Sequence, residues 1–220
     1  MNAMAKRLLD IVGSVLGLLV LGPVMIVIAI MIKATSAGPV FFAQDRIGLR
    51  GTHFSMLKFR SMVDNAEKQG TGLFSFEGDP RITRVGHVLR RKSLDELPQL
   101  INVLTGAMSL VGPRPPVTYE LGPWEEYTPE MRKRFDVKPG ITGLAQVSGR
   151  NDLEWDDKIV FDNRYVDLYA RWGVLIDLRI LAQTVWVVLA GKNTVEAEKV
   201  EGSEGEIAAR AREAGRGKQE

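Results

Sequence analysis

The sequence predicts a mostly helical α+β protein in which an apolar N-terminal segment precedes a small domain with a short β-hairpin. Residues 11–32 carry no ionisable side chain, and residues 39–44 and 52–59 are short apolar runs separated by Gly48 and Gly51. Apolar runs joined across glycines are typical of a β-hairpin. Helical spacing of apolar residues recurs in the rest of the chain. These observations indicate a membrane-inserted segment joined to an α+β domain.

The N-terminal apolar stretch, residues 11–32, is long enough to span a bilayer, which needs about 20 apolar residues. Gly22-Pro23 lies in its middle, and Pro23 removes a backbone donor, so we expect a kink or a break there. Lysine and arginine residues flank both ends, and the positive-inside tendency therefore places both ends in the cytoplasm. A re-entrant helix–break–helix meets this condition. A kinked ordinary span is the alternative that the residues leave open.

The domain after this segment is predicted to be built mainly of helices around the hairpin. Helical patterns occur at residues 61–68, 82–92, 97–104, 124–134, 153–169 and 175–189. The charged face of the fourth helix is expected to be solvated, and the last helix is apolar nearly all round, so it should be buried or lie against lipid. Beyond residue 192 the composition is that of a mobile tail. We therefore divide the chain into a membrane-inserted segment (1–36), a globular domain (37–192) and a charged tail (193–220).

Composition excludes several kinds of site. The 220 residues suffice for one ordinary domain with appendages, and the formal net charge is only +2. This charge balance gives no support for nucleic-acid binding, and we expect no nucleic-acid partner. The chain has no cysteine and two histidines, neither in a metal-ligand spacing. Disulfides, thiolate catalysis and cysteine-based metal sites are therefore excluded.

Two adjacent carboxylates, Asp95 and Glu96, follow a cationic run and precede a predicted helix. With Asp95 as the N-cap, Pro98 falls in the first helical turn, where its missing N–H costs no hydrogen bond. The carboxylates then lie at the positive end of the helix dipole, which favours their ionised form and lowers their pKa values. Such a carboxylate can attack phosphorus or hold a metal. The alternative is that Asp95 merely caps the helix.

Three further stretches suit an anionic ligand. Lys58 and Arg60 lie where a strand ends and a helix is predicted to begin, which would make an anion cradle. Arg114 stands between prolines on a rigid extended segment that would aim a guanidinium at a phosphate, although a turn with a solvated arginine fits equally well. The glycine-rich stretch 138–151, which contains Gln146 and Arg150, allows close backbone approach to a ligand.

Taken in order, these motifs resemble the bacterial sugar transferase family, the monotopic phosphoglycosyl transferases, over about residues 4–192. The motifs that carry the resemblance follow the apolar N-terminal segment and are FAQDRIG at 42–48, KFRSM at 58–62, LDELPQL at 94–100, GPRP at 112–115 and PGITG at 139–143. The chain departs from the family pattern at Leu144, where tryptophan is common, and at Asp156-Asp157, where a glutamate pair is usual. Neither departure touches the carboxylate pair.

The resemblance implies transfer of a phosphosugar from a UDP-sugar to undecaprenyl phosphate at the cytoplasmic face of the inner membrane. It implies Mg²⁺ as cofactor and a re-entrant segment broken at Gly22-Pro23. Asp95 would be the nucleophile that attacks the β-phosphorus and releases UMP, as well as a metal ligand, with Glu96 as its catalytic partner. The implied and inferred substrate-binding residues are Lys58, Arg60, Arg114, Gln146, Arg150 and Asp162.

The expected partners are therefore the UDP-sugar, undecaprenyl phosphate and membrane lipid. A homodimer through the apolar helix near Trp186 is left open. Two other functions would use the same sequence features differently. A metal-dependent hydrolase of lipid or nucleotide diphosphates would use the same carboxylates with water as acceptor, and a non-catalytic membrane-anchored assembly module would bind without releasing UMP.

Overall fold

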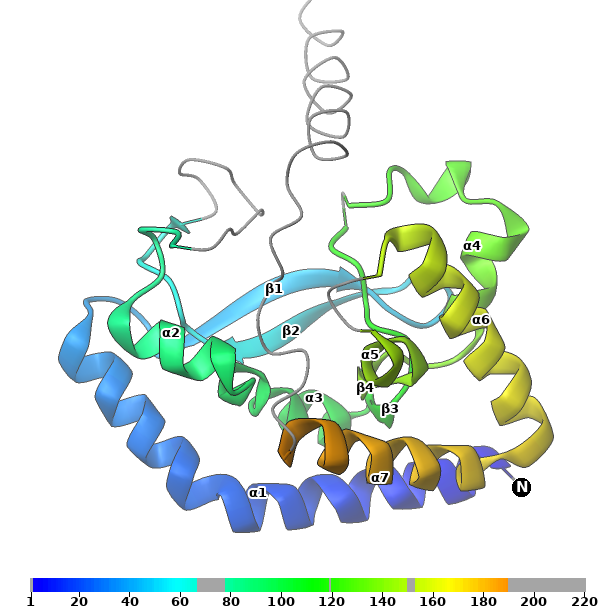
Figure 1. The fold of residues 1–220 in the computed structure, drawn as a ribbon, viewed down its shortest axis with the longest axis horizontal. Helices are drawn as coiled ribbons and strands as arrows, with labels where there is room; N and C mark the ends of the chain where they lie inside the picture. Colours follow the sequence, from blue (N-terminus) through cyan, green and yellow to red (C-terminus); the bar gives the residue numbers. More distant parts are fainter. Residues whose placement is uncertain (1, 67–77, 119, 150–152, 190–220) are drawn as a thin grey trace, which may run out of the picture.

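The computed structural model describes residues 2–66, 78–118, 120–149 and 153–189, and it confirms a mostly helical α+β fold (Figure 1). The helices are α1 (Asn2–Thr35), α2 (Arg84–Arg91), α3 (Gln99–Thr105), α4 (Pro129–Lys133), α5 (Leu144–Ser148), α6 (Trp155–Trp172) and α7 (Val174–Leu189). The strands are β1 (Phe41–Ile47), β2 (His53–Phe59), β3 (Ser109–Val111) and β4 (Gly140–Thr142). The predicted tail, 193–220, lies outside the described residues.

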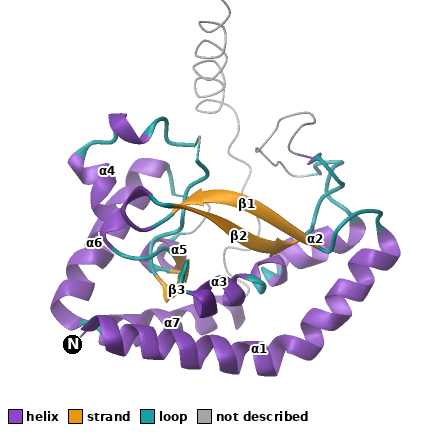
Figure 2. Cartoon of the chain, turned by 180° about the vertical axis from the view of Figure 1, so that it is seen from behind, coloured by secondary structure: helices purple, strands orange, loops and turns teal. Residues whose placement is uncertain are grey.

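The predicted hairpin is confirmed. Strands β1 and β2 pair antiparallel with Phe41 opposite Phe59 and Ile47 opposite His53, and they run through the middle of the molecule (Figure 2). The connection turns through left-handed backbone at Arg50 (φ 52°) and Gly51 (φ 78°), which explains the glycine there. Strands β3 and β4 form a second, parallel pair. This short pair matters for the site because the chain leaves β3 directly into the proline-flanked Arg114.

The N-terminal helix α1 is continuous, so the expected break at Gly22-Pro23 does not appear. Pro23 lies inside the helix, which bends in its middle along one side of the molecule (Figure 1). Proline removes one helical hydrogen bond and crowds the preceding turn, and both effects bend a helix. The helix stays continuous where neighbouring contacts stabilise it. Within the part of the chain that the structure describes, α1 is the one helix long and apolar enough to cross a membrane.

The C-terminal half of α1 packs into the domain. Ile28 and Ile32 are buried in a cluster with Phe59 of β2 and with Val85 and Leu89 of α2. Burial of an isoleucine side chain contributes about 1.5–3 kcal/mol, so these contacts hold this end of α1 firmly against the domain.

The N-terminal end of α1 is held by a buried ion pair. Lys6 Nζ lies 2.8 Å from Asp177 Oδ2 of α7 and donates to the backbone oxygen of Val111 at 2.9 Å. Tyr165 donates its hydroxyl to the other oxygen of Asp177 at 2.7 Å. Lys6, which the sequence indicated as a flanking charge, is therefore buried, and it joins α1 to the strand β3 that leads to Arg114.

The next two charges of α1 also bind the domain. Arg7 donates to the carbonyls of Val103 and Leu104 at the C-terminal end of α3, both at 2.7 Å. Asp10 accepts from the backbone N–H of Leu110 in β3 at 2.9 Å. These three bonds tie the first turns of α1 to backbone groups at the end of α3 and in β3.

Two predicted helices are wrong. The helix expected at 61–68 is replaced, within the described residues, by strand-like pairing of residues 61–63 with 81–83: Val63 N–H donates to Arg81 O at 2.8 Å and Thr83 N–H to Ser61 O at 3.0 Å. These long-range bonds outcompete the local helical preference. The helix expected at 124–134 is divided into a 3-10 turn, the short α4 and a second 3-10 turn.

Candidate active site

Asp95 and Glu96 lie in a 3-10 turn, Leu94–Glu96, between α2 and α3. The preceding Ser93 has a left-handed backbone (φ 53°), a strained conformation for a residue other than glycine. Asp95 is therefore not the helix N-cap that the sequence predicted, and its side chain caps neither the turn nor α3. Pro98, which has no N–H, directly precedes α3, and the turn that holds the carboxylates ends two residues before it, at Glu96.

The Asp95 carboxylate is buried and is not paired with any charged group that the structure describes. The residue is 8% exposed, and its side chain forms no hydrogen bond or ion pair with the described residues. Burial and the neighbouring charge of Glu96 raise its pKa above the ordinary value, while Lys58, Arg90 and Arg114 act in the opposite direction. The lowered pKa expected from a helix dipole is therefore wrong for this structure, because desolvation dominates. An unpaired carboxylate among cations remains well placed for nucleophilic attack on an anionic phosphate.

Glu96, in contrast, is held by two cations. Arg114 Nη2 donates to Glu96 Oε1 at 2.7 Å, and Lys58 Nζ lies 3.7 Å from the same oxygen. Burial lowers the pKa of Lys58 to about 8, against the attraction of Glu96, and the Glu96 charge raises the pKa of Arg114. The fold thus brings together four of the predicted site residues from three places: Lys58 from β2, Asp95 and Glu96 from the turn, and Arg114 from the loop after β3.

The remaining predicted residues are placed differently. Arg60 donates to the backbone and side-chain oxygens of Ser36, at 2.9 and 2.7 Å, and so ties β2 to the end of α1. Gln146 lies on α5, and its buried amide has no hydrogen-bond partner within the described ranges. Arg150 lies outside the described residues.

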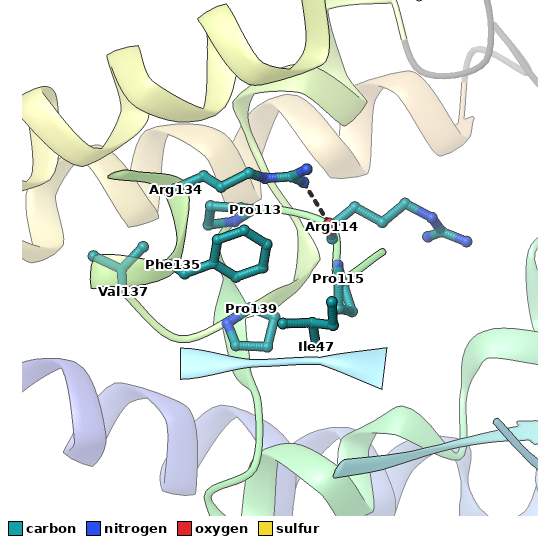
Figure 3. A pocket seen from close by; sticks show the side chains of 8 residues that line it. All are labelled: Ile47, Pro113, Arg114, Pro115, Arg134, Phe135, Val137 and Pro139. Carbon is teal, nitrogen blue, oxygen red and sulfur yellow. Dashed lines mark hydrogen bonds between the residues drawn. The ribbon is translucent and has the colours of Figure 1, made fainter. Parts of the chain in front are cut away.

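Asp162 of α6 forms a fully buried ion pair with Arg134. The two groups lie 2.8 Å apart, and each side chain is 1% exposed. Burial raises the pKa of Asp162 to about 6, while the charge of Arg134 acts in the opposite direction. Arg134 also donates to the backbone oxygen of Arg114 at 2.6 Å, the bond drawn in Figure 3.

Sequence reasoning missed Arg134 because it treated this part of the chain as a solvated helix. The signal that could have found it is the run of aromatic residues around it. Trp124 packs edge-to-face on Phe135 and Tyr127 packs on it at a tilt, with ring-centroid distances of 5.1 and 5.9 Å, and the three rings form a small core there. A cation inside such a core is buried by its neighbours.

A small cavity lies behind Arg114. Its lining is formed by Ile47, Pro113, Arg114, Pro115, Arg134, Phe135, Val137 and Pro139 (Figure 3). In Figure 3 the guanidinium of Arg114 points away from this cavity, while its backbone faces Arg134. The backbone of residues 113–115 thus packs against the cavity lining, and the Arg114 guanidinium points in the opposite direction, toward Glu96.

The carboxylates fit a magnesium ion that arrives with a substrate. Among the described residues no three Asp, Glu or His side chains gather as a metal cage. Mg²⁺ is commonly held by one or two carboxylates together with phosphate oxygens and water. Asp95 offers an unpaired carboxylate of this kind, whereas Oε1 of Glu96 is engaged by Arg114.

Comparison with known proteins gives a consistent result. The model of a family described as bacterial sugar transferase matches residues 1–191. The uncharacterized sugar transferase EpsL of Bacillus subtilis is 40% identical over 203 residues, which cover 90% of this chain and 96% of EpsL.

Two longer relatives match through part of their length. The galactosyl transferase CpsE of Streptococcus agalactiae is 44% identical over 201 residues, 86% of this chain and 43% of CpsE. The undecaprenyl-phosphate galactose phosphotransferase of Salmonella typhimurium is 42% identical over 198 residues, 84% of this chain and 40% of that enzyme. The chain therefore spans about two fifths of the length of these two relatives.

Proposed function

The chain belongs to the bacterial sugar transferase family, and we propose that it transfers a phosphosugar from a UDP-sugar to undecaprenyl phosphate. The names of two relatives support this acceptor: one is an undecaprenyl-phosphate galactose phosphotransferase, and another, from Xanthomonas campestris, is a UDP-glucose:undecaprenyl-phosphate glucose-1-phosphate transferase. The observation that carries the proposal is the buried carboxylate of Asp95, which has no partner in the described part of the chain, beside a Glu96 held by Arg114 and Lys58.

The proposed reaction proceeds in two displacements. A carboxylate oxygen of Asp95 attacks the β-phosphorus of the UDP-sugar, the bond from that phosphorus to the bridging oxygen breaks, and UMP leaves with the bridging oxygen. A phosphate oxygen of undecaprenyl phosphate then attacks the phosphorus of the acyl phosphosugar. The bond to Asp95 breaks, the carboxylate is regenerated, and the lipid carries the phosphosugar.

The surrounding charges explain how one carboxylate approaches a diphosphate. Arg114 and Lys58 carry positive charge next to Asp95 and reduce the repulsion between the two anions. Glu96 orients both cations through a single oxygen. We propose that Asp95 and the diphosphate together hold Mg²⁺, which would neutralise charge on the phosphate oxygens.

We further propose that α1 enters and leaves the membrane on the same side. Its 34 residues are about 51 Å long, more than the hydrocarbon thickness of about 30 Å. Lys6 near one end and Ile32 near the other both contact the same domain, which cannot lie on both sides of a bilayer. The middle of the helix exposes large apolar side chains, Leu19, Val20, Val24, Ile26 and Val27. These features support a re-entrant helix, and the lysine and arginine residues at both of its ends favour the cytoplasmic face for the domain.

Helix α7 extends the same apolar surface. It lies alongside the N-terminal half of α1 in both views (Figures 1 and 2). Leu175, Leu178, Val185 and Trp186 are exposed on it, and Trp172 is exposed just before it. Tryptophan and leucine on an exposed helix face suit the membrane–water interface, so we propose that α7 lies against lipid.

Release of UMP tests the proposed reaction. Purified protein with undecaprenyl phosphate and a panel of UDP-sugars should release UMP and form lipid-linked phosphosugar in equal amounts. Asp95→Asn should abolish both, whereas the matched control Asp167→Asn, at an exposed ion pair with Lys133, should leave both unchanged. UMP together with free sugar phosphate would instead identify a hydrolase, and binding without UMP release would indicate an assembly module.

Single cysteines test the topology, since the chain has none of its own. Ala3→Cys and Thr35→Cys should both react with a membrane-impermeant maleimide from the cytoplasmic side in inverted vesicles. Reaction of the two positions from opposite sides would show an ordinary span.

A further inference from the structure

We propose, on the premise of the phosphosugar transfer described above, that Arg134 and Arg46 are positioning residues for Arg114. Their guanidinium groups bind backbone carbonyls within residues 113–116 and so fix the position of the Arg114 guanidinium beside the carboxylates. Asp162 contributes by fixing Arg134, so its role is to position rather than to contact the substrate.

Most residues of the segment 113–116 lack a backbone N–H donor. Pro113, Pro115 and Pro116 have no N–H, so the segment is anchored through its carbonyl oxygens instead. At its two ends the partners are backbone groups: Gly140 N–H donates to Pro113 O at 2.9 Å, and Ile47 N–H donates to Pro116 O at 3.1 Å.

The two middle carbonyls are bound by buried guanidinium groups. Arg134 Nη2 donates to Arg114 O at 2.6 Å, and Arg46 Nη1 donates to Pro115 O at 2.8 Å. All four successive carbonyls thus accept a hydrogen bond. The carbonyls of Arg114 and Pro115 accept charge-assisted bonds, which are the stronger kind.

Arg134 is itself fixed on three sides. Asp162 Oδ2 lies 2.8 Å from its Nη2, and the guanidinium stacks over the rings of Trp155 and Phe135 at 5.2 and 5.4 Å from their centroids. With a side chain 1% exposed, it is shielded from solvent, and from a substrate bound at the surface. Any influence on the reaction must therefore pass through the groups it touches.

The burial of Arg134 is costly for the fold. Its Nε and Nη1 have no hydrogen-bond partner among the described residues, and a buried ion pair is often replaceable by apolar side chains without loss of stability. Since stability alone does not explain such a group, its bond to the Arg114 carbonyl supplies the reason. A rigid backbone aims the Arg114 side chain at Glu96 Oε1, 2.7 Å away.

A double-mutant cycle between Arg134 and Arg114 tests the proposal in the full-length protein. The measured quantity is kcat/KM for the UDP-sugar, from UMP release. Arg134→Met should lower it about tenfold to hundredfold, because small displacements of a positioned group cost about that much. In an Arg114→Ala background the same change should have less than about a threefold effect, because the group being positioned is gone.

Arg132→Met is the matched control. Arg132 lies two residues away, is exposed and also donates to backbone carbonyls, those of Trp124 and Glu125 at 3.2 Å. Its replacement should change kcat/KM by less than about twofold. Arg134→Lys should restore only part of the rate, since an ammonium cannot reproduce the planar fork.

The outcomes distinguish failure of the positioning role from failure of the proposed reaction. Equal losses from Arg134→Met in both backgrounds would overturn the positioning role, because general destabilisation adds to the effect of Arg114→Ala. If thermal unfolding shows that Arg134→Met does not fold, Arg46→Met in the same cycle decides the question by the same criterion. Absence of UMP release from the unmodified protein would instead refute the proposed function itself.

Discussion

Replacing Lys6 with methionine tests whether the first turns of α1 are part of the catalytic domain. The ammonium lies 2.8 Å from a fully buried Asp177 and also donates to Val111 O, three residues before Arg114. Removal of one partner of a buried ion pair costs about 3–5 kcal/mol, because the other charge is left uncompensated. At roughly 2–4 °C per kcal/mol for a chain of this size, the unfolding temperature should fall by about 6–20 °C.

The assay is thermal unfolding in detergent, compared at one scan rate. Lys33→Met is the matched control, because Lys33 lies near the other end of α1, is exposed and donates to a single carbonyl, that of Gly38 at 3.2 Å. It should shift the unfolding temperature by no more than about 2 °C. The double variant Lys6→Met/Asp177→Asn should recover most of the loss, because no buried charge is left. A Lys6→Met protein as stable as the unmodified one, or a double variant as unstable as the sum of the two single changes, would refute this reasoning.

Three further predictions follow from the charges of the site. Since the pKa of Lys58 is lowered to about 8, kcat/KM for the UDP-sugar should fall as pH rises through about 8. Lys58→Arg should remove this decline because arginine stays charged, and an unchanged pH profile in that variant would contradict the role of Lys58. Asp162 binds a proton more tightly in the folded protein, with a pKa of about 6, than in the unfolded chain, near 4. The unmodified protein should therefore lose stability relative to Asp162→Asn as pH rises from about 4 to 6 in urea unfolding, and parallel pH curves would contradict it. Chelation of divalent cations should abolish UMP release without lowering the unfolding temperature, and excess Mg²⁺ should restore it; turnover that persists in chelator would remove the metal from the reaction.

Local sequence patterns predicted the elements whose causes are local. Two apolar runs separated by glycines became the β1–β2 hairpin, with Gly51 in the left-handed conformation that its position requires. Apolar spacing predicted α6 and α7 to within a few residues at each end. The family resemblance, rather than a local pattern, placed Lys58 and Arg114 in one site with the carboxylates, and in the structure both contact Glu96.

The failures arose where distant residues decide the local structure. The chain after β2 is not helical because residues 61–63 pair with 81–83, which no local pattern reveals. Asp95 caps neither the 3-10 turn nor α3, and its pKa is governed by burial in the folded domain rather than by a dipole. Arg134 was assigned to a solvated face because the aromatic core that buries it forms only in the folded domain.

The central claim is that Asp95 bonds covalently to phosphorus during turnover. The most direct measurement mixes the enzyme with a UDP-sugar in the absence of undecaprenyl phosphate, quenches the mixture and determines the intact mass and the modified peptide. We predict the added mass of one sugar phosphate on the peptide that contains Asp95, its loss when undecaprenyl phosphate is added, and its absence from Asp95→Asn. If the enzyme releases UMP and forms lipid-linked product when undecaprenyl phosphate is present, yet carries no adduct at any quench time, the transfer is a direct displacement and the account is contradicted.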